Sequence, residues 1–160
     1  IAYNDTENVR TMKMMCFSCQ YLESIPLLNT SNVTNMNSTF GSCESLLSIP
    51  LLNTSKVTKM NGTFYKCSKI VTIPLLDTSN VTMLSQTFLE CLSLETIPLL
   101  DTSNVTNMYY CFKECAKLVS IPALNVSKVT SFSGCFTGCT SLKSILMTGM
   151  KVSFDISAST

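Results

Sequence analysis

The sequence predicts a repeat solenoid, a fold in which one short unit is stacked on copies of itself. Three residue types recur every 24 positions without insertion or deletion. They are Pro26, Pro50, Pro74, Pro98 and Pro122, the valines at 9, 33, 57, 81, 105 and 129, and the cysteines at 19, 43, 67, 91, 115 and 139. A fixed period of this length is typical of stacked repeats, in which each unit buries its apolar face only against its neighbours.

The first element expected in each unit is a short strand, as at residues 46–51. Leu46, Ile49 and Leu51 are predicted to point inward, and strands of successive turns to stack in parallel about 4.8 Å apart. Because Pro50 has no N–H to donate, the strand is expected to end at or near Ile49.

A polar turn and two further elements complete the unit. An Asn or Asp side chain, such as Asn53, is expected to close the turn by accepting hydrogen bonds from backbone N–H groups two residues on. Residues 57–60 are expected to form a second short strand. Met60, Phe64 and Cys67 follow at i, i+4 and i+7, which predicts one face of a short helix or 3₁₀ segment.

The two ends differ from the middle. The six-turn repeat is predicted to cover residues 1–147, and a C-terminal cap to cover 148–160. Val152, Phe154 and Ile156 alternate with polar residues, which predicts a closing strand. The chain begins in phase with its repeat and without a polar cap, so we expect it to be part of a longer chain.

The unit Phe-x-x-Cys-x-x-Leu-x-x-Ile resembles the BspA-like (Treponema-type) leucine-rich repeats of bacterial surface proteins. The run Asp-Thr-Ser-Asn-Val-Thr-Asn-Met at 101–108 is similar to their TSNVTNM-type repeats. The resemblance extends over residues 1–147, with departures at Cys16, Ala123, Val126 and Phe132. It implies a right-handed solenoid of short parallel strands and short helix or 3₁₀ segments, carried by surface or secreted proteins that act as adhesins. Similar repeats also occur in phage-encoded proteins.

Composition argues against several classes of function. Lys and Arg number 11 against 10 Asp and Glu, with a net charge of +1 and no basic stripe, so nucleic acid is not an expected partner. No apolar run reaches the roughly 18 residues of a membrane span. The chain has no histidine, and its carboxylates fall on turns or outward positions. We therefore predict a non-catalytic protein without a cofactor.

Two clusters nevertheless contain groups that can bind a metal. Cys111, Cys115, Cys135 and Cys139 form two i, i+4 pairs in consecutive turns, which suits either a zinc site or a Cys111–Cys135 disulfide. Free, buried thiols are the preferred interpretation, because an odd count of nine spread evenly does not resemble a disulfide scaffold. Asp77 and Asp101 occupy equivalent positions in adjacent turns, where they either share a proton or Ca²⁺ or simply close turns; we prefer the second.

Binding specificity requires positions that differ from turn to turn. The candidate binding residues are Tyr65, Leu89, Tyr109, Tyr110 and Lys113, which we expect to form an exposed amphipathic stripe. The alternative is that they are scattered surface residues. The uniform Ser/Thr column that includes Ser48 and Thr72 offers the same chemistry at each turn and suits only a repetitive ligand such as a polysaccharide.

These observations lead to one main functional hypothesis and one alternative. The first is a protein-binding, adhesin-type module of a larger bacterial surface or secreted protein, located outside the cell or at its surface. Its partner would be a host or bacterial surface protein or a glycan. The second is a structural or host-recognition component of a phage particle. A signal peptide and an anchor in the full gene would favour the first, and neighbouring tail or capsid genes the second.

Overall fold

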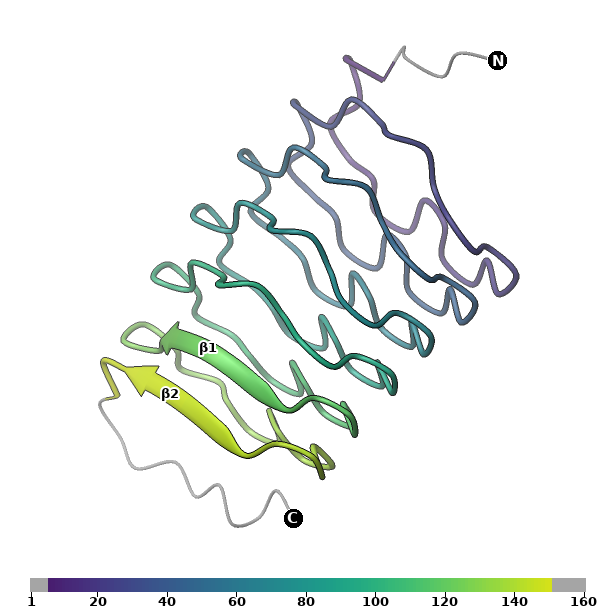
Figure 1. Cartoon of the computed structure of the whole chain (residues 1–160). Coiled ribbons are helices and arrows are strands. Elements are labelled where there is room, and N and C mark those ends of the chain that lie inside the picture. The colour runs from purple at the N-terminus through teal and green to yellow at the C-terminus, as the bar shows by residue number, and fades with distance from the viewer. Residues whose placement is uncertain (1–5, 151–160) are drawn as a thin grey trace.

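The computed structural model describes residues 6–150, which wind into a regular stack of turns (Figure 1). Single parallel bridges join Thr11, Asn35, Lys59, Met83, Asn107 and Ser131 in succession. Each step along this series is 24 residues, so each sequence repeat makes one turn of the stack. The second predicted strand, at residues 57–60, is thus reduced to one bridge per turn. Within residues 6–150, no helix is long and apolar enough to cross a membrane.

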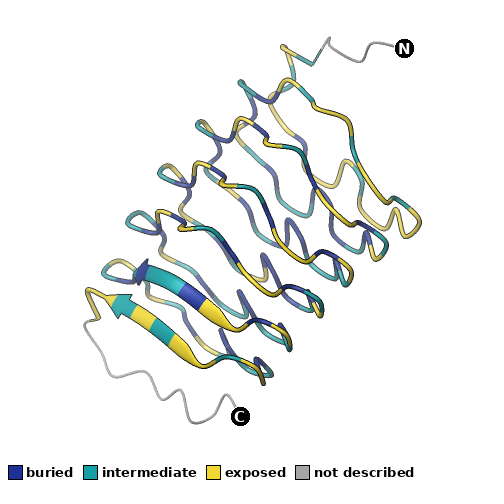
Figure 2. Ribbon diagram, in the orientation of Figure 1, coloured by how far each residue is buried: buried dark blue, intermediate teal, exposed yellow. Residues whose placement is uncertain are grey.

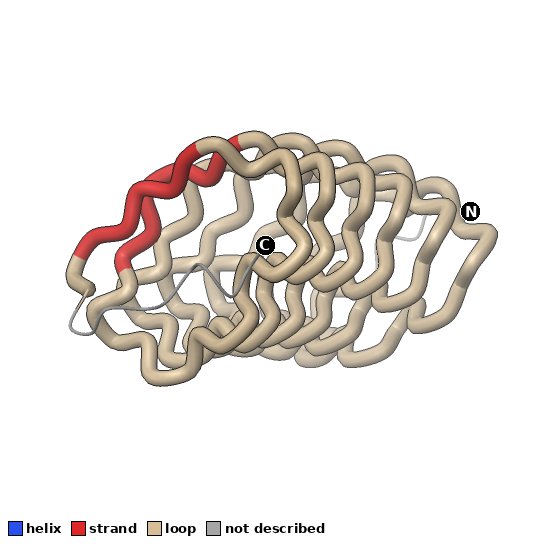
Figure 3. The backbone as a smooth tube through the Cα atoms, turned by 90° about the horizontal axis from the view of Figure 1, so that it is seen from below, coloured by secondary structure: helices blue, strands red, loops and turns tan. Residues whose placement is uncertain are grey.

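Two strands are present among the described residues, and they lie side by side in the last two turns (Figure 3). β1 (Ser120–Asn125) pairs in parallel with β2 (Ser144–Thr148). The prediction that the strand ends at or near the isoleucine before proline is wrong in this turn, because β1 continues from Ile121 through Pro122 to Asn125. In β2, Leu146 follows the isoleucine where earlier turns have proline, and it has the backbone N–H that proline lacks.

The register of this pair contains a bulge at the proline. Ile121 lies opposite Ile145 and Leu124 opposite Met147, so two residues of β1 face only Leu146 of β2. An extra residue on one strand changes which side chains face the core. Ile121 and Leu124 are therefore both buried although they are three positions apart.

The same spacing of three corrects the predicted core. In the second turn, Leu46, Ile49 and Leu52 are buried, whereas Leu51 is 63% exposed. The inward orientation predicted for Leu51 is therefore wrong. Its equivalents share this exposure, and together they form a column that we call the leucine stripe: Leu27, Leu51, Leu75 and Leu99.

The predicted short helices are absent from the described residues, and backbone dihedral angles explain why. Two positions per turn have positive φ, for example Ser38 and Ser42, and these left-handed residues recur in all six turns. A left-handed residue every fourth position breaks a right-handed helix. The chain instead forms successive tight turns that still direct Met36, Phe40 and Cys43 inward.

Backbone hydrogen bonds in this segment alternate between two kinds of partner. The N–H groups of Ser38 and Phe40 donate to Asn61 and Thr63 in the next turn. The N–H groups of the alternating residues Thr39 and Gly41 donate instead to carbonyl oxygens three residues earlier in their own turn. Both donor sets are thus satisfied, which allows this non-helical segment to be buried.

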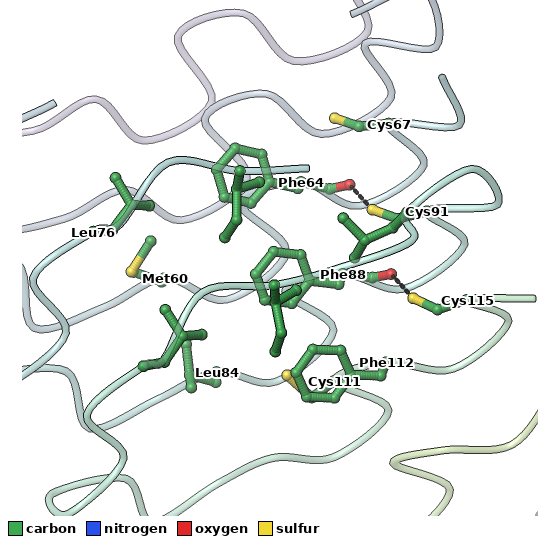
Figure 4. Packing of buried hydrophobic residues seen from close by; sticks show 14 of the residues in the cluster. Met60, Phe64, Cys67, Leu76, Leu84, Phe88, Cys91, Cys111, Phe112 and Cys115 are labelled. Carbon is green, nitrogen blue, oxygen red and sulfur yellow. Dashed lines mark hydrogen bonds between the residues drawn. The ribbon is translucent and has the colours of Figure 1, made fainter. Parts of the chain in front are cut away.

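The core is a continuous column of buried residues between the two sides of each turn (Figure 2), and Figure 4 shows some of their side chains. The phenylalanine rings stack from turn to turn, with centroids 5.6 Å apart for Phe64 and Phe88 and 5.2 Å for Phe88 and Phe112. Burial of each such ring contributes roughly 1.5–3 kcal/mol. The predicted closing strand at residues 151–157 lies outside the described residues.

Candidate functional site

The candidate binding residues stand on the segment that follows each inward phenylalanine. Tyr65 and Lys113 occupy the same position two turns apart, with Leu89 between them, so they are separated by roughly 10 Å along the stack. Inter-turn hydrogen bonds hold this column: the N–H of Lys66 donates to the carbonyl of Leu89, and the N–H of Glu90 to that of Lys113. The side chains therefore project from a fixed backbone.

Three of the predicted residues meet in one cluster. The rings of Tyr109 and Tyr110 stack with centroids 3.9 Å apart, and the ammonium nitrogen of Lys113 lies 4.6 Å from the Tyr110 centroid. All three side chains are partly exposed. A hydrogen bond to Tyr110 raises the pKa of the Tyr109 phenol. The cluster thus presents two aromatic faces, two hydroxyls and a cation in a small area.

Tyr110 is held in a backbone conformation that disfavours it. Its φ is 54°, and two equivalent positions in other turns are glycines, Gly62 and Gly134. A bulky residue in the left-handed region costs about 1–2 kcal/mol. The Tyr110 ring lies against Gly134, where an added Cβ would be only 2.2 Å from Cε1 of the ring. Glycine at 134 is therefore required both by its own φ of 62° and by the ring above it.

Tyr65 belongs to a second cluster, which sequence reasoning found only in part. The Lys66 ammonium lies 5.4 Å from the Tyr65 centroid and 3.6 Å from the Glu90 carboxylate. Hydrogen bonding to Tyr65 and the charge of Glu90 raise the pKa of Lys66. Lys66 and Glu90 also line a shallow hollow of about 200 Å³ with Glu44. One feature of the sequence could have identified this ion pair. Lys66 and Glu90 occupy equivalent positions in adjacent turns, and each directly follows a candidate binding residue.

Leu89 does not have the exposure that the stripe was expected to give it. Its side chain is 7% exposed, whereas Tyr65 and Lys113 in the neighbouring turns are partly exposed. Longer side chains on either side can cover a shorter apolar one with their own apolar atoms, and this burial is favourable. Leu89 thus separates the two clusters as an apolar spacer.

The cysteines are free thiols whose role in the core is more specific than simple packing. The Cys91 sulfur donates to the carbonyl oxygen of Phe64 at 3.0 Å, and Cys115 donates to Phe88 in the same way (Figure 4). Cys43, Cys67 and Cys139 make the equivalent bond, each to the residue 27 positions earlier. Each thiol therefore ties its turn to the preceding one.

Burial also governs the acidity of these thiols. It raises the pKa of Cys43 and of Cys139 to about 11, and it raises the pKa values of Cys111 and Cys115 well above the ordinary value of a thiol. A zinc ligand must be a thiolate, which this environment disfavours. Within residues 6–150, no group of three or more Cys, Asp or Glu side chains is placed to hold a metal ion.

Asp77 and Asp101 close turns, as the preferred interpretation predicts. One carboxylate oxygen of Asp77 accepts hydrogen bonds from the N–H and hydroxyl of Ser79 at 3.0 and 2.6 Å. The carboxylate of Asp101 accepts one from the Ser103 N–H at 2.9 Å. These bonds lower the pKa of both aspartates.

Comparison with known proteins gives a family match and a structural likeness. The model of the family described as "Mycoplasma protein of unknown function, DUF285" matches residues 1–71 and 48–150. This match agrees with the BspA-like repeats identified in the sequence. A crystal structure of the Treponema pallidum leucine-rich repeat protein superposes with a TM-score of 0.47 and 18% identity, over 82% of this chain and 70% of that one. No curated protein matches the chain.

Proposed function

Since the chain belongs to the family described as Mycoplasma protein of unknown function, DUF285, we propose that it is a non-catalytic protein-binding module. Its place would be in a larger bacterial surface or secreted protein, where a rigid stack of turns presents side chains to a host or bacterial surface partner. The BspA-like character of the repeats supports this setting, because such repeats are typical of surface-associated proteins.

The observation that carries the proposal is the cluster of Tyr109, Tyr110 and Lys113. Tyrosine and cationic side chains supply a large share of binding energy at protein interfaces, since an aromatic ring buries much area at little entropic cost. Met14, Ser38 and Gln86 have the same positive φ at the equivalent position of other turns, so it is the aromatic side chain of Tyr110, stacked on Tyr109, that distinguishes this turn.

The rest of the surface supports binding more than chemistry. The buried polar residues of the described chain are all threonines, and each of these hydroxyls has a hydrogen-bond partner. The Thr63 hydroxyl, for example, donates to the carbonyls of Met36 and Met60. Polar groups in the interior are thus used to hold turns together, and the outward side chains are the ones that remain for a partner.

An adhesion assay tests the proposal. Beads coated with the full chain should bind cultured epithelial cells or members of a glycan and matrix-protein panel. The Tyr65→Ser/Tyr110→Ser double variant should weaken binding by about 2 kcal/mol or more, because it removes one ring from each cluster. Surface plasmon resonance on any positive panel member would give the affinity.

The chain supplies a matched control for this substitution. Tyr21 is 91% exposed and lies in the first turn, away from both clusters. Tyr21→Ser should bind like the wild type. Wild-type affinity in the double variant would mean that the clusters are only solvated surface, and a polysaccharide following the uniform Ser/Thr column would then become the better candidate ligand.

A further inference from the structure

The first turn carries a pair of thiols with a spacing that no other turn has. Cys16 and Cys19 form a Cys-x-x-Cys sequence, because Cys16 takes the position that phenylalanine holds in the other turns. The remaining cysteines are buried, whereas Cys19 is exposed and Cys16 is partly exposed. A Cys-x-x-Cys pair that solvent can reach is typical of thiols that exchange with disulfides.

The backbone of the first turn brings these two residues together. The Cys19 N–H donates to the carbonyl oxygen of Cys16 at 3.1 Å, and Ser18 between them has a φ of 61°. This hydrogen bond closes a β-turn, whose end residues have Cα atoms less than about 7 Å apart. A disulfide requires about 4.4–6.8 Å between Cα atoms. The pair can therefore close a disulfide with little movement of the backbone.

The two side chains also lie on the same side of the chain. In the second turn the equivalent residues, Phe40 and Cys43, are both fully buried and face the core. Cys16 and Cys19 occupy the same two positions of the first turn. Burial and, after it, the charge of Cys19 raise the pKa of Cys16. Because one thiolate affects the other only at short range, the two sulfur atoms lie near each other.

Contacts with the second turn hold this β-turn in place. The N–H of Ser18 donates to the carbonyl oxygen of Gly41 at 2.7 Å. The Phe17 ring lies against the same glycine, where an added Cβ would be 2.8 Å from Cδ2 of the ring. The Cys43 thiol donates to the carbonyl oxygen of Cys16 at 3.0 Å. The turn is thus fixed through its backbone and its central residue.

We propose that Cys16 and Cys19 form a reactive dithiol, which reduces small-molecule disulfides and closes into an intramolecular Cys16–Cys19 disulfide. The oxidant is a low-molecular-weight disulfide of the glutathione type, written RSSR. One RSSR and the two protein thiols give one protein disulfide and two RSH. The reaction is stoichiometric, and it is separate from the binding clusters, which lie in later turns.

The exposure of the two residues determines the order of the steps. Cys19 is the more exposed, so its thiolate attacks one sulfur of RSSR, and the displaced RS⁻ takes up a proton from water. The product is a mixed disulfide at Cys19. The Cys16 thiol then releases its proton to water, and its thiolate attacks the Cys19 sulfur and displaces the second RS⁻. Burial still raises the pKa of Cys16 at this stage, but the charge of Cys19 that raised it further is gone.

The same geometry explains why the reaction stops at this pair. The turn holds Cys16 beside the mixed disulfide, so the second step is intramolecular and faster than attack by a second small thiol. Cys43 is the next thiol of the column, and it is buried with its proton donated to the Cys16 carbonyl. Burial raises the pKa of Cys43 to about 11, and a protonated thiol is a poor nucleophile. The deeper cysteines therefore stay reduced.

Oxidised glutathione is the probe that tests the proposal. The reduced native chain is incubated with it at about pH 8, near the ordinary pKa of a thiol, and the remaining thiols are then alkylated. Trypsin releases a peptide from Met14 to Lys56 that holds Cys16, Cys19 and Cys43, and fragmentation in the mass spectrometer locates the bond. We expect a Cys16–Cys19 disulfide and an alkylated Cys43. A native chain that keeps both thiols, a mixed disulfide that persists at Cys19, or a Cys19–Cys43 bond overturns the proposal.

Serine variants separate the two steps. Cys16→Ser keeps the exposed thiol and lacks the second, so Cys19 should accumulate as the mixed disulfide with glutathione. Cys19→Ser should lower the rate at which oxidised glutathione is consumed at least about tenfold, because the first step loses its thiol. If Cys16→Ser still closes a disulfide, or Cys19→Ser reacts at the wild-type rate, the roles assigned to the two thiols are wrong.

Cys43→Ser is the matched control. Its hydroxyl can still donate to the Cys16 carbonyl, so this variant should form the Cys16–Cys19 disulfide at the wild-type rate. Failure of Cys43→Ser to close a disulfide would show that Cys43, and not Cys16, supplies the second thiol. Circular dichroism of each variant before oxidation checks that the fold is unchanged.

Discussion

Alkaline pH is expected to unfold this protein through its cysteines. Burial raises the pKa of Cys43 and Cys139 to about 11, and those of Cys91, Cys111 and Cys115 well above the ordinary value. In the unfolded chain each thiol ionises near pH 8.5. The stabilisation from keeping these thiols protonated is therefore complete below about pH 8.5 and is lost as pH rises toward the folded values.

The size of this effect follows from proton linkage. Between the unfolded and folded pKa values, each thiol lowers the free energy of unfolding by about 1.4 kcal/mol per pH unit. Five strongly shifted thiols (Cys67, Cys91, Cys111, Cys115 and Cys135) together lower it by up to about 7 kcal/mol per pH unit. A domain of this kind has about 5–15 kcal/mol in total, so it should unfold roughly one to two pH units above 8.5.

Urea unfolding followed by circular dichroism, under reducing conditions and at several values between pH 7 and 10.5, measures the slope. Cys91→Ser should reduce the slope by about 1.4 kcal/mol per pH unit, because the hydroxyl can donate to Phe64 but does not ionise. Phe64→Leu serves as control: it lowers stability at every pH and leaves the slope unchanged. Stability that is flat from pH 8 to 10, or a slope that Cys91→Ser does not change, would refute the reasoning.

Three other predictions concern the core and the thiols. Phe64→Ala should lower the free energy of unfolding by about 3–5 kcal/mol in urea titrations, because it removes one ring from the stacked column; a loss under about 1 kcal/mol would contradict its burial. In native alkylation followed by mass spectrometry, the exposed Cys19 should react quickly while Cys67 and Cys91 react only after denaturation, and rapid labelling of the latter two would show that the column opens. Chelator treatment should leave the melting temperature unchanged, whereas stoichiometric zinc that is lost in Cys111→Ser would restore the four-thiol site.

The period of 24 was sufficient to predict the stack of turns and most of its core. Phe40, Phe64, Phe88 and Phe112 are all buried, as are Met36 and Cys43. This success has a simple cause: a residue type that recurs without slippage must meet the same surroundings in every turn. The backbone between these positions was not predictable in the same way, because positive φ at Ser38 and Ser42 leaves no mark in a pattern of apolar residues.

The leucine stripe shows how a local detail changes an inference about surface. Alternation with a period of two predicts that Ile49 and Leu51 both face inward, and it leaves Leu52 outside. In the second turn the buried positions Ile49 and Leu52 are instead three residues apart, so that Leu52 faces the core and Leu51 faces solvent. Two adjacent leucines in an extended segment cannot both face one core, so their recurrence was already a signal that one apolar column lies on the surface.

The candidate site was predictable in composition but not in grouping. Tyr109, Tyr110 and Lys113 were identified as departures from the repeat, and they meet, whereas Leu89 was assigned to the surface and is buried. A departure from the repeat identifies a residue that differs from its equivalents in the other turns. Whether the side chain of that residue is exposed depends on the residues next to it in the adjacent turns. Leu89 is shorter than the residues above and below it. Tyr110 is long, and the turn that follows it provides only glycine, so its ring can lie outside the stack where a partner can reach it.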